Sequence, residues 1–318
     1  MRAVFLDYAT VSHRDDLDPS RLTRALPGLE LRPQTAQSAV PRAIAGAGAV
    51  LVNKLRIDRE AIAATPTLRL VVLAATGTNN VDLETARERG VAVCNLHDYC
   101  TASVVQHVMG TLLLLTHRLR EYDALVRSGA WQKGEQFCLL EYPIRELCGR
   151  RFGIVGYGTL GRAVGRAAQA FGMELAIANR PGGATRPGRV SLAELLPSVD
   201  VLSLHCPLTA ATEGLIGARE LALMKPDAVL INTARGALVD GVALAAALRV
   251  GRLGGAAIDV LPREPPTDGD PLLAADIPNL IVTPHVAWGA REARQRSLDE
   301  MAANVEDFLR GGRRGRVV

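Results

Sequence analysis

Short apolar runs alternate along this chain with longer segments in which apolar residues recur every three or four positions. In the first hundred residues the apolar runs have the length of buried strands, and they lie at Val4–Leu6, Ala49–Val52, Leu70–Ala74 and Val91–Cys94. The segments between them have helical periodicity, at Pro41–Ala47, Arg59–Ala64 and Leu83–Arg89. Alternation of strands with helices is typical of a parallel sheet that is covered on both faces.

The stretch Tyr99–Gly129 contains no proline and predicts one long helix, which Thr101 or Ser103 can cap. A second series of strands follows, at Arg151–Val155, Glu174–Ala178, Val201–Leu204, Val229–Asn232, Ala256–Val260 and Leu280–Val282. Caps for its helices are expected at Ser191-x-x-Glu194 and at Asp240, and Arg291–Leu309 predicts a terminal helix. The pattern therefore predicts two α/β domains joined by the long helix, and it leaves open on which domain the terminal helix packs.

Length and composition agree with two folded domains. The chain has 318 residues, of which 48% are hydrophobic and 22% charged, so overall disorder is excluded. The formal net charge is only +4 and the charges are dispersed, which argues against a nucleic-acid partner. Arginines cluster only at the C-terminus, at Arg310, Arg313, Arg314 and Arg316, where a frayed, solvated tail is expected.

Membrane insertion, metal binding and disulfide bonding are not indicated. No apolar run approaches the roughly 18 residues of a membrane span, and the first residues predict a strand rather than a signal peptide. The five cysteines are scattered, without a CxxC pair, so we expect neither a zinc site nor a disulfide framework. A reducing cytoplasm is the expected location.

A glycine-rich turn follows the first strand of the second series. The strand Phe152–Val155 leads into Gly156-x-Gly158-x-x-Gly161, and a helical stretch, Arg162–Ala170, comes next. The first glycine permits a tight turn, the second lets the backbone approach a pyrophosphate, and the third allows close contact of helix and strand. Because strand, loop and helix are all present, this segment predicts a dinucleotide site.

The next strand ends at Asn179-Arg180, where a carboxylate would commonly bind the adenosine ribose. Asn179 can still hydrogen-bond a ribose hydroxyl, and Arg180 can pair with a 2′-phosphate or stack on adenine. We therefore expect NAD or NADP as cofactor. A solvent-exposed turn before Pro181 is the alternative interpretation of this pair.

Three later strand ends carry polar residues of types that can take part in catalysis. Arg235 follows Val229–Asn232, Glu264 lies after Ala256–Val260, and His285 follows Leu280–Val282. Ligands of open α/β sheets bind at the carboxyl ends of strands, so these side chains should converge.

The three side chains suit reduction of a 2-oxo acid. An arginine fork binds a carboxylate through two parallel hydrogen bonds, and a histidine can donate a proton near neutral pH. A glutamate that hydrogen-bonds the imidazole fixes its orientation and stabilises its protonated form. Each residue taken alone could simply support the fold. Their order on successive strand ends favours a catalytic role.

The chain resembles the D-isomer-specific 2-hydroxyacid dehydrogenase family over nearly its whole length. The resemblance rests on Ala74–Asp82, the glycine loop, His205–Thr209, Asn232–Gly236, Glu264-Pro265-Pro266 and Thr283-Pro284-His285. Within the family the sequence is most similar to the glycerate dehydrogenase (hydroxypyruvate reductase) branch, through Val52-Asn53-Lys54, Ser103–His107 and Trp288. This resemblance implies an enzyme that reduces hydroxypyruvate or glyoxylate to D-glycerate or glycolate with NADH or NADPH.

The resemblance also implies an architecture. Two Rossmann-like or flavodoxin-like domains with parallel sheets are expected, with the active site in the cleft between them. Residues 1–98 and 290–318 would form the substrate-binding domain, and residues 99–289 the dinucleotide-binding domain. A homodimer through the helix at 100–130 is expected.

Site residues are implied in three groups. The catalytic residues would be Arg235, Glu264 and His285. Cofactor contacts are expected from Val104, Gly156, Tyr157, Gly158, Thr159, Leu160, Gly161, Asn179, Arg180, Cys206, Pro207, Thr212, Thr233, Ala234, Asp259 (at the cofactor amide) and Ala287. Substrate contacts are expected from Asn53, Lys54, Thr76, Gly77, Arg235, His285 and Trp288.

Two alternative functions remain at this point. One is a regulator that senses NAD(H), since transcriptional corepressors of the same fold resemble the enzymes at Arg235, Glu264 and His285. The other is a sister activity such as phosphoglycerate dehydrogenase. Oxidation of NADH or NADPH with a panel of 2-oxo acids distinguishes an enzyme from a regulator.

Overall fold

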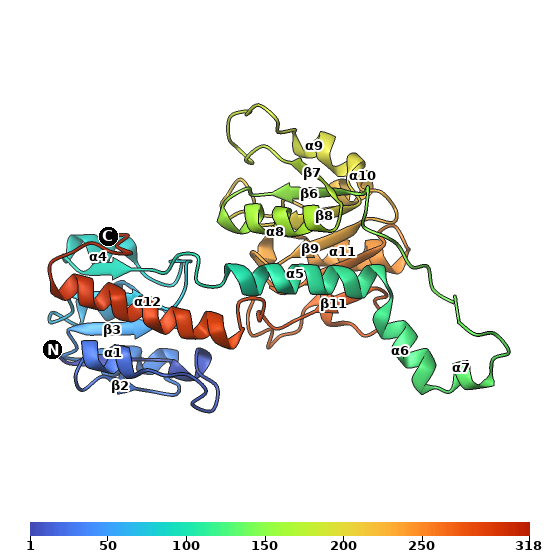
Figure 1. The fold of residues 1–318 in the computed structure, drawn as a ribbon. Helices are drawn as coiled ribbons and strands as arrows, with labels where there is room; N and C mark the ends of the chain where they lie inside the picture. The colour runs from blue at the N-terminus through green and yellow to red at the C-terminus, as the bar shows by residue number, and fades with distance from the viewer. The chain divides into compact units, whose positions relative to one another are not determined.

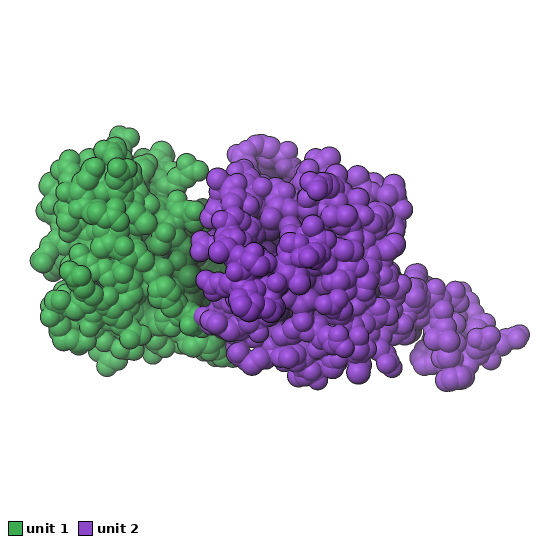
Figure 2. All heavy atoms as spheres, turned by 90° about the horizontal axis from the view of Figure 1, so that it is seen from above, with its two compact units in different colours: residues 1–100, 288–318 green, residues 101–287 purple.

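The computed structural model describes all residues, 1–318, and divides them into two compact units. Unit 1 comprises Met1–Cys100 and Trp288–Val318, and unit 2 comprises Thr101–Ala287 (Figure 2). Each unit contains one sheet in which every strand pair is parallel, so the predicted α/β class is confirmed. No helix is both long and apolar enough to cross a membrane.

Unit 1 has a five-stranded sheet in the order β2-β1-β3-β4-β5. Its strands are β1 (Ala3–Phe5), β2 (Glu30–Leu31), β3 (Ala49–Val52), β4 (Leu70–Leu73) and β5 (Ala92–Cys94). Its α-helices are α1 (Ser20–Ala25), α2 (Val40–Ile44), α3 (Arg59–Ala63), α4 (Leu83–Glu88) and α12 (Arg291–Leu309). The sequence pattern did not predict β2, which has only two residues and no apolar run.

Alternate residues of each strand in unit 1 belong to different cores, as the period of two in a strand requires. One face buries Ala3, Phe5, Leu51, Leu70 and Val72 together with Leu298, Met301 and Val305 of α12. The opposite face buries Val4, Leu6, Val50, Val71 and Leu73 with Ile44 of α2 and Ile62 of α3. The terminal helix, whose packing the sequence left open, therefore belongs to unit 1.

The expectation of a frayed C-terminal tail was wrong. Asn95 N–H donates to the Gly315 carbonyl at 2.9 Å, and Val317 N–H donates to the Val93 carbonyl at 2.8 Å. Cys94 and Arg316 form an antiparallel bridge, so the tail lies along the outer edge of β5. Edge strands expose unpaired backbone groups, and this pairing satisfies them.

Unit 2 has a six-stranded sheet in the order β11-β10-β9-β8-β6-β7. The strands are β6 (Arg151–Val155), β7 (Glu174–Ile177), β8 (Val201–Leu204), β9 (Val229–Asn232), β10 (Gly255–Ile258) and β11 (Leu280–Val282). The helices are α5 (Thr101–Thr116), α6 (Leu119–Arg127), α7 (Ala130–Lys133), α8 (Thr159–Ala170), α9 (Leu192–Leu195), α10 (Ala218–Leu223) and α11 (Gly241–Arg249). The expected capping box at Ser191 and the cap at Asp240 are both present.

The strand order of unit 2 reverses at β6, since β7 lies on one side of it and β8 on the other. Open α/β sheets bind ligands at such a point, outside the carboxyl ends of the strands. Helices α5 and α8 pack side by side over this sheet (Figure 1). The fold therefore brings the glycine loop, which joins β6 to α8, to the position where a dinucleotide is expected.

The single long helix predicted for Tyr99–Gly129 is interrupted. Arg118 has a left-handed backbone with φ of 54°, which ends α5 and starts α6 in a new direction. The Arg118 guanidinium donates to the side chain of Asn279, so a tertiary contact holds the break. Figure 1 shows α6 and α7 standing away from the sheet of unit 2.

Candidate active site

The glycine loop after β6 has the geometry that a pyrophosphate site needs. Gly156 has φ of 96°, a region that favours glycine, and a Cβ here would lie 2.5 Å from the Cys206 nitrogen. A Cβ at Gly161, in the first turn of α8, would lie 2.2 Å from the Gly156 carbonyl oxygen. These two glycines are therefore required by the fold itself.

Gly158 differs from its two neighbours in the motif. Its φ is −84°, and a Cβ built on it would meet no protein atom within 4 Å. The protein therefore gives no packing reason for a glycine at this N-terminal cap of α8. The open space in front of Gly158 fits the close approach of a phosphate to the helix N-terminus.

The Asn179-Arg180 turn after β7 lies in a basic loop. The side-chain oxygen of Asn179 accepts a hydrogen bond from the Arg186 backbone at 3.0 Å, and Arg180 is exposed. The guanidinium of Arg189 lies 5.9 Å from the ring centroid of Tyr157 in the glycine loop. Arg180 was predicted as a cofactor residue and Arg189 was not, because the proximity of Arg189 to Tyr157 arises only in the folded loop.

The segment after β8 supports the glycine loop from the other side. His205 N–H donates to the Val155 carbonyl at 2.7 Å, and His205 Nε2 lies 2.9 Å from the Ser203 hydroxyl. Burial lowers the pKa of His205 to about 4, so the imidazole is neutral at pH 7. His205 was not among the predicted site residues, although the predicted Cys206 and Pro207 follow it directly.

Two predicted cofactor-binding threonines have different environments. The Thr212 hydroxyl donates to the Pro207 carbonyl at 2.8 Å and accepts from Thr209 N–H at 2.8 Å, which stabilises that turn. The Thr233 hydroxyl, directly after β9, is buried without a hydrogen-bond partner in the protein. Buried polar atoms are normally paired, so Thr233 fits a position where a bound cofactor supplies the partner.

Arg235 is the first residue of the expected catalytic group. Its Nη1 donates to the Ala234 carbonyl at 2.7 Å, and its own carbonyl accepts from Asn232 Nδ2 at 2.8 Å. A Cβ on the following residue, Gly236, would lie 2.0 Å from the Leu261 carbonyl carbon. The turn that carries Arg235 therefore packs directly against the loop that leads to Glu264.

Glu264 and His285 are in direct contact. Oε2 of Glu264 lies 2.6 Å from Nδ1 of His285, and Oε1 accepts from Leu261 N–H at 2.9 Å. Because an ionised carboxylate only accepts hydrogen bonds, Nδ1 of His285 carries a proton. The Glu264 carboxylate therefore fixes the tautomer and the orientation of the His285 ring.

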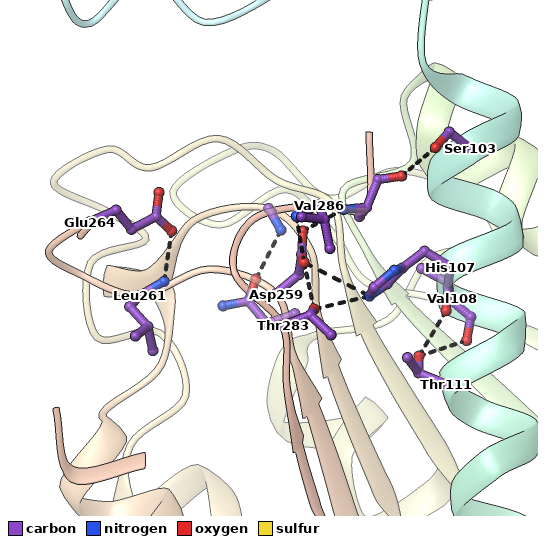
Figure 3. Close-up of polar contacts among 12 residues, drawn as sticks. Ser103, His107, Val108, Thr111, Asp259, Leu261, Glu264, Thr283 and Val286 are labelled. Atoms are coloured by element: carbon purple, nitrogen blue, oxygen red, sulfur yellow. Dashed lines mark hydrogen bonds and ion pairs between the residues drawn. The ribbon is translucent and has the colours of Figure 1, made fainter. Parts of the chain in front are cut away.

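Asp259, at the end of β10, holds the turn that contains His285. The side chain is 1% exposed, and its carboxylate accepts from Thr283 Oγ1 at 2.5 Å and from Val286 N–H and Ala287 N–H at 2.9 Å each (Figure 3). His285 N–H donates to the Asp259 carbonyl at 2.8 Å. In this structure Asp259 thus supports the turn, a role that the sequence did not indicate.

Four of the five substrate residues expected in unit 1 follow β3 and β4, which are neighbouring strands, and the fifth is Trp288. Asp7, which is 2% exposed, accepts from Asn53 N–H at 2.9 Å and from Lys54 N–H at 2.7 Å. The Thr76 carbonyl, beside Gly77, accepts from Asn95 Nδ2 at 2.7 Å. Asp7 was not predicted as a site residue, because a carboxylate that follows an N-terminal strand has no distinctive spacing.

Comparison with known proteins identifies the family. A sequence profile described as the NAD-binding domain of D-isomer-specific 2-hydroxyacid dehydrogenases matches residues 109–287. The chain belongs to the D-isomer-specific 2-hydroxyacid dehydrogenase family. This confirms the family that the sequence motifs predicted.

Two curated relatives of this dehydrogenase have named activities. Glycerate dehydrogenase of Methylorubrum extorquens is 44% identical over 267 residues, with 84% of each chain covered. Hydroxypyruvate reductase of Blautia hydrogenotrophica is 39% identical over 272 residues, again with 84% of each covered. A crystal structure of the TT0316 protein from Thermus thermophilus has 34% identity and a TM-score of 0.87, with complete coverage of both chains.

The family assignment establishes the general chemistry. The dehydrogenase is an enzyme that interconverts 2-oxo and 2-hydroxy acids with a nicotinamide dinucleotide. The open space at Gly158 and the unpartnered Thr233 hydroxyl fit such a cofactor. When bound, such a cofactor would supply or accept the hydride of this reaction.

Alanine at two positions of the glycine loop separates cofactor binding from folding. We expect Gly158→Ala to keep the parental Tm, because its Cβ meets no protein atom, and to weaken NADH binding by at least about tenfold. Gly161→Ala should instead lower Tm, because its Cβ overlaps the Gly156 carbonyl. Thermal unfolding and NADH titration of both variants test this; parental NADH affinity in Gly158→Ala would contradict a phosphate site there.

Proposed function

We propose that this dehydrogenase reduces hydroxypyruvate or glyoxylate to D-glycerate or glycolate. The observation that carries the proposal is the 2.6 Å contact of Glu264 with His285, beside the turn that bears Arg235. The names of the relatives from Methylorubrum extorquens and Blautia hydrogenotrophica support this substrate class.

Arg235 would bind the carboxylate of the substrate. The bond of Nη1 to the Ala234 carbonyl orients the guanidinium, and its other N–H groups can form a fork with two carboxylate oxygens. The same fork polarises the neighbouring oxo group. A lysine could supply the charge but not the two parallel donors.

His285 would act as the proton donor. With Nδ1 held by Glu264, the protonated ring donates from Nε2 to the oxo oxygen as the hydride reaches carbon. Glu264 balances the positive charge of the imidazolium and keeps its orientation. In the reverse direction the neutral ring accepts the hydroxyl proton at the same nitrogen.

Substrate selection would involve loops of unit 1. We assign Asn53, Lys54, Thr76 and Gly77 to this role, together with Trp288. The assignment is supported by the carboxyl ends of β3 and β4, where the first four residues lie, and by the resemblance to the glycerate dehydrogenase branch. Asn53 and Thr76 carry polar side chains that suit a substrate with a hydroxymethyl substituent, and Gly77 adds no side-chain bulk.

Removal of the imidazole tests the proton donor. We expect His285→Ala to lower kcat on hydroxypyruvate by roughly 10²–10⁴, the usual contribution of a positioned general acid, with little change in NADH binding. His13→Ala, at an exposed histidine, is the matched control. Near-parental kcat in His285→Ala would remove His285 from the mechanism. A parent that binds NADH but reduces no 2-oxo acid would instead favour the regulatory alternative.

The basic loop after β7 supports use of NADPH as well as NADH. An aspartate or glutamate at position 179 would repel a 2′-phosphate, and Asn179 lacks that charge. Arg180, Arg186 and Arg189 belong to the same loop, and Arg189 lies against Tyr157. We assign Arg180 to the 2′-phosphate, through charge-assisted hydrogen bonds.

Two substitutions test this cofactor assignment. Arg180→Ala should reduce kcat/KM for NADPH more than for NADH, by about 1–3 kcal/mol of transition-state stabilisation. Asn179→Asp should strengthen the preference for NADH. The exposed Arg219 on α10 provides a control, Arg219→Ala. Equal effects of Arg180→Ala on the two cofactors would show that Arg180 does not bind the phosphate.

We propose a homodimer through the helical segment at 100–130, extended by the residues that follow it directly. Apolar side chains between α6 and β6 are exposed, with Phe137 at 90%, Leu140 at 77% and Trp131 at 48%. Exposed apolar patches of this kind mark interaction surfaces, and a second copy of the chain is the commonest partner.

The five free cysteines support the expected location in a reducing compartment such as the cytoplasm.

A charged residue in this patch tests the dimer. We expect the parent to have twice the chain mass in light scattering, and Leu140→Asp to shift it toward the monomer because a buried carboxylate would be unpaired. Val250→Asp, which changes a side chain that is 78% exposed elsewhere in unit 2, should leave the mass unchanged. A monomeric parent would contradict the proposed assembly.

A further inference from the structure

The turn that carries His285 is held from a second side, by helix α5. Asp259 binds the turn from the end of β10, as described above. Facing it, the Ser103 hydroxyl donates to the Ala287 carbonyl at 2.6 Å, and Nε2 of His107 lies 3.3 Å from Thr283 Oγ1 (Figure 3). Ser103 and His107 are four residues apart, so they lie on one face of α5, one turn from each other.

The hydrogen-bond inventory determines the direction of the His107 contact. Thr283 has one hydroxyl proton, and its 2.5 Å contact with Asp259 uses that proton because a carboxylate only accepts. Thr283 Oγ1 must therefore accept from His107, and Nε2 of His107 carries the proton. The same nitrogen lies 3.9 Å from Oδ1 of Asp259.

The backbone of the turn explains why two supports are needed. His285 has φ of 55°, a left-handed conformation that is unfavourable for a residue with a Cβ. Such a conformation persists only where the surroundings impose it. The contacts at Thr283 and Ala287 hold the turn on both sides of His285, and each of these residues is bound by both Asp259 and α5.

We infer that Ser103 and His107 are positioning residues for the proton donor. They act through Ala287 and Thr283 and touch neither substrate nor hydride. The inference rests on the proposed role of His285. Helix α5 would then have a second role besides packing on α8, because it fixes the position of the turn that carries His285. A displacement of a catalytic group by about 1 Å can reduce turnover strongly, so loss of these contacts should lower kcat.

Variants of His107 test the inference in steady-state kinetics. We expect His107→Leu to lower kcat on hydroxypyruvate by about tenfold, with KM and the NADH dissociation constant within about a factor of two of the parent. His107→Gln should recover most of kcat, because its amide nitrogen can donate where Nε2 does. His117→Leu, just beyond the end of α5, is the matched control and should retain the parental kcat.

A double-mutant cycle tests the route through Thr283. Thr283→Val removes the hydroxyl that links His107 to Asp259. The kcat of the double variant, His107→Leu with Thr283→Val, should then equal that of the less active single variant, since both changes break the same linkage. Multiplicative losses in kcat would show that His107 acts independently of Thr283 and would overturn the inference.

Hydrogen exchange of the turn provides a readout that does not depend on activity. The N–H groups of Val286 and Ala287 should exchange about tenfold faster in His107→Leu, and at parental rates in His117→Leu and His107→Gln. Parental kcat and parental exchange in His107→Leu would overturn the inference. So would a loss of kcat, NADH affinity and Tm together, which would indicate a general folding defect. A parent without 2-oxo acid reductase activity would refute the proposed function, while exchange would still report whether α5 holds the turn.

Discussion

The position of the reacting groups depends on one buried carboxylate. Asp259 is almost completely removed from water, and an ionised carboxylate in that environment is stable only if donors surround it. The donors come from the Thr283 hydroxyl and from two backbone N–H groups of the next turn. Because the turn folds around this carboxylate, His285 has a left-handed backbone and its ring approaches Glu264. The hydrogen bonds that the buried Asp259 carboxylate requires therefore also orient the imidazole of His285.

Much of the fold was predictable because its signals are local. Apolar runs marked most of the strands, and alternation with helices indicated parallel sheets. The features that were missed depend on tertiary contacts. The break at Arg118 involves neither glycine nor proline and is held by Asn279, which is distant in sequence. The tail was expected to fray because arginine and glycine dominate it, yet backbone groups rather than side chains pair it with β5.

The candidate site divides in the same way. Arg235, Glu264 and His285 could be selected from sequence, because each follows a predicted strand and their chemistry is complementary. The assignment of roles to these residues stays a prediction. The residues that hold them were not apparent: Asp7 beneath the Asn53–Lys54 loop, Gly236 against Leu261, and His107 behind Thr283. Supporting residues act through backbone groups and close approaches, which no spacing in the sequence encodes.

The discontinuity of unit 1 has a consequence for synthesis of the chain. Leu298, Met301 and Val305 of α12 complete one core of unit 1, and the tail completes the edge of its sheet, yet both are translated after all of unit 2. Unit 2 is continuous in sequence and can fold as soon as it leaves the ribosome. The first hundred residues must wait with an apolar sheet face uncovered until the last segment emerges. The ribosome therefore finishes the cofactor-binding half first, and the earliest residues to be made are among the last to be buried.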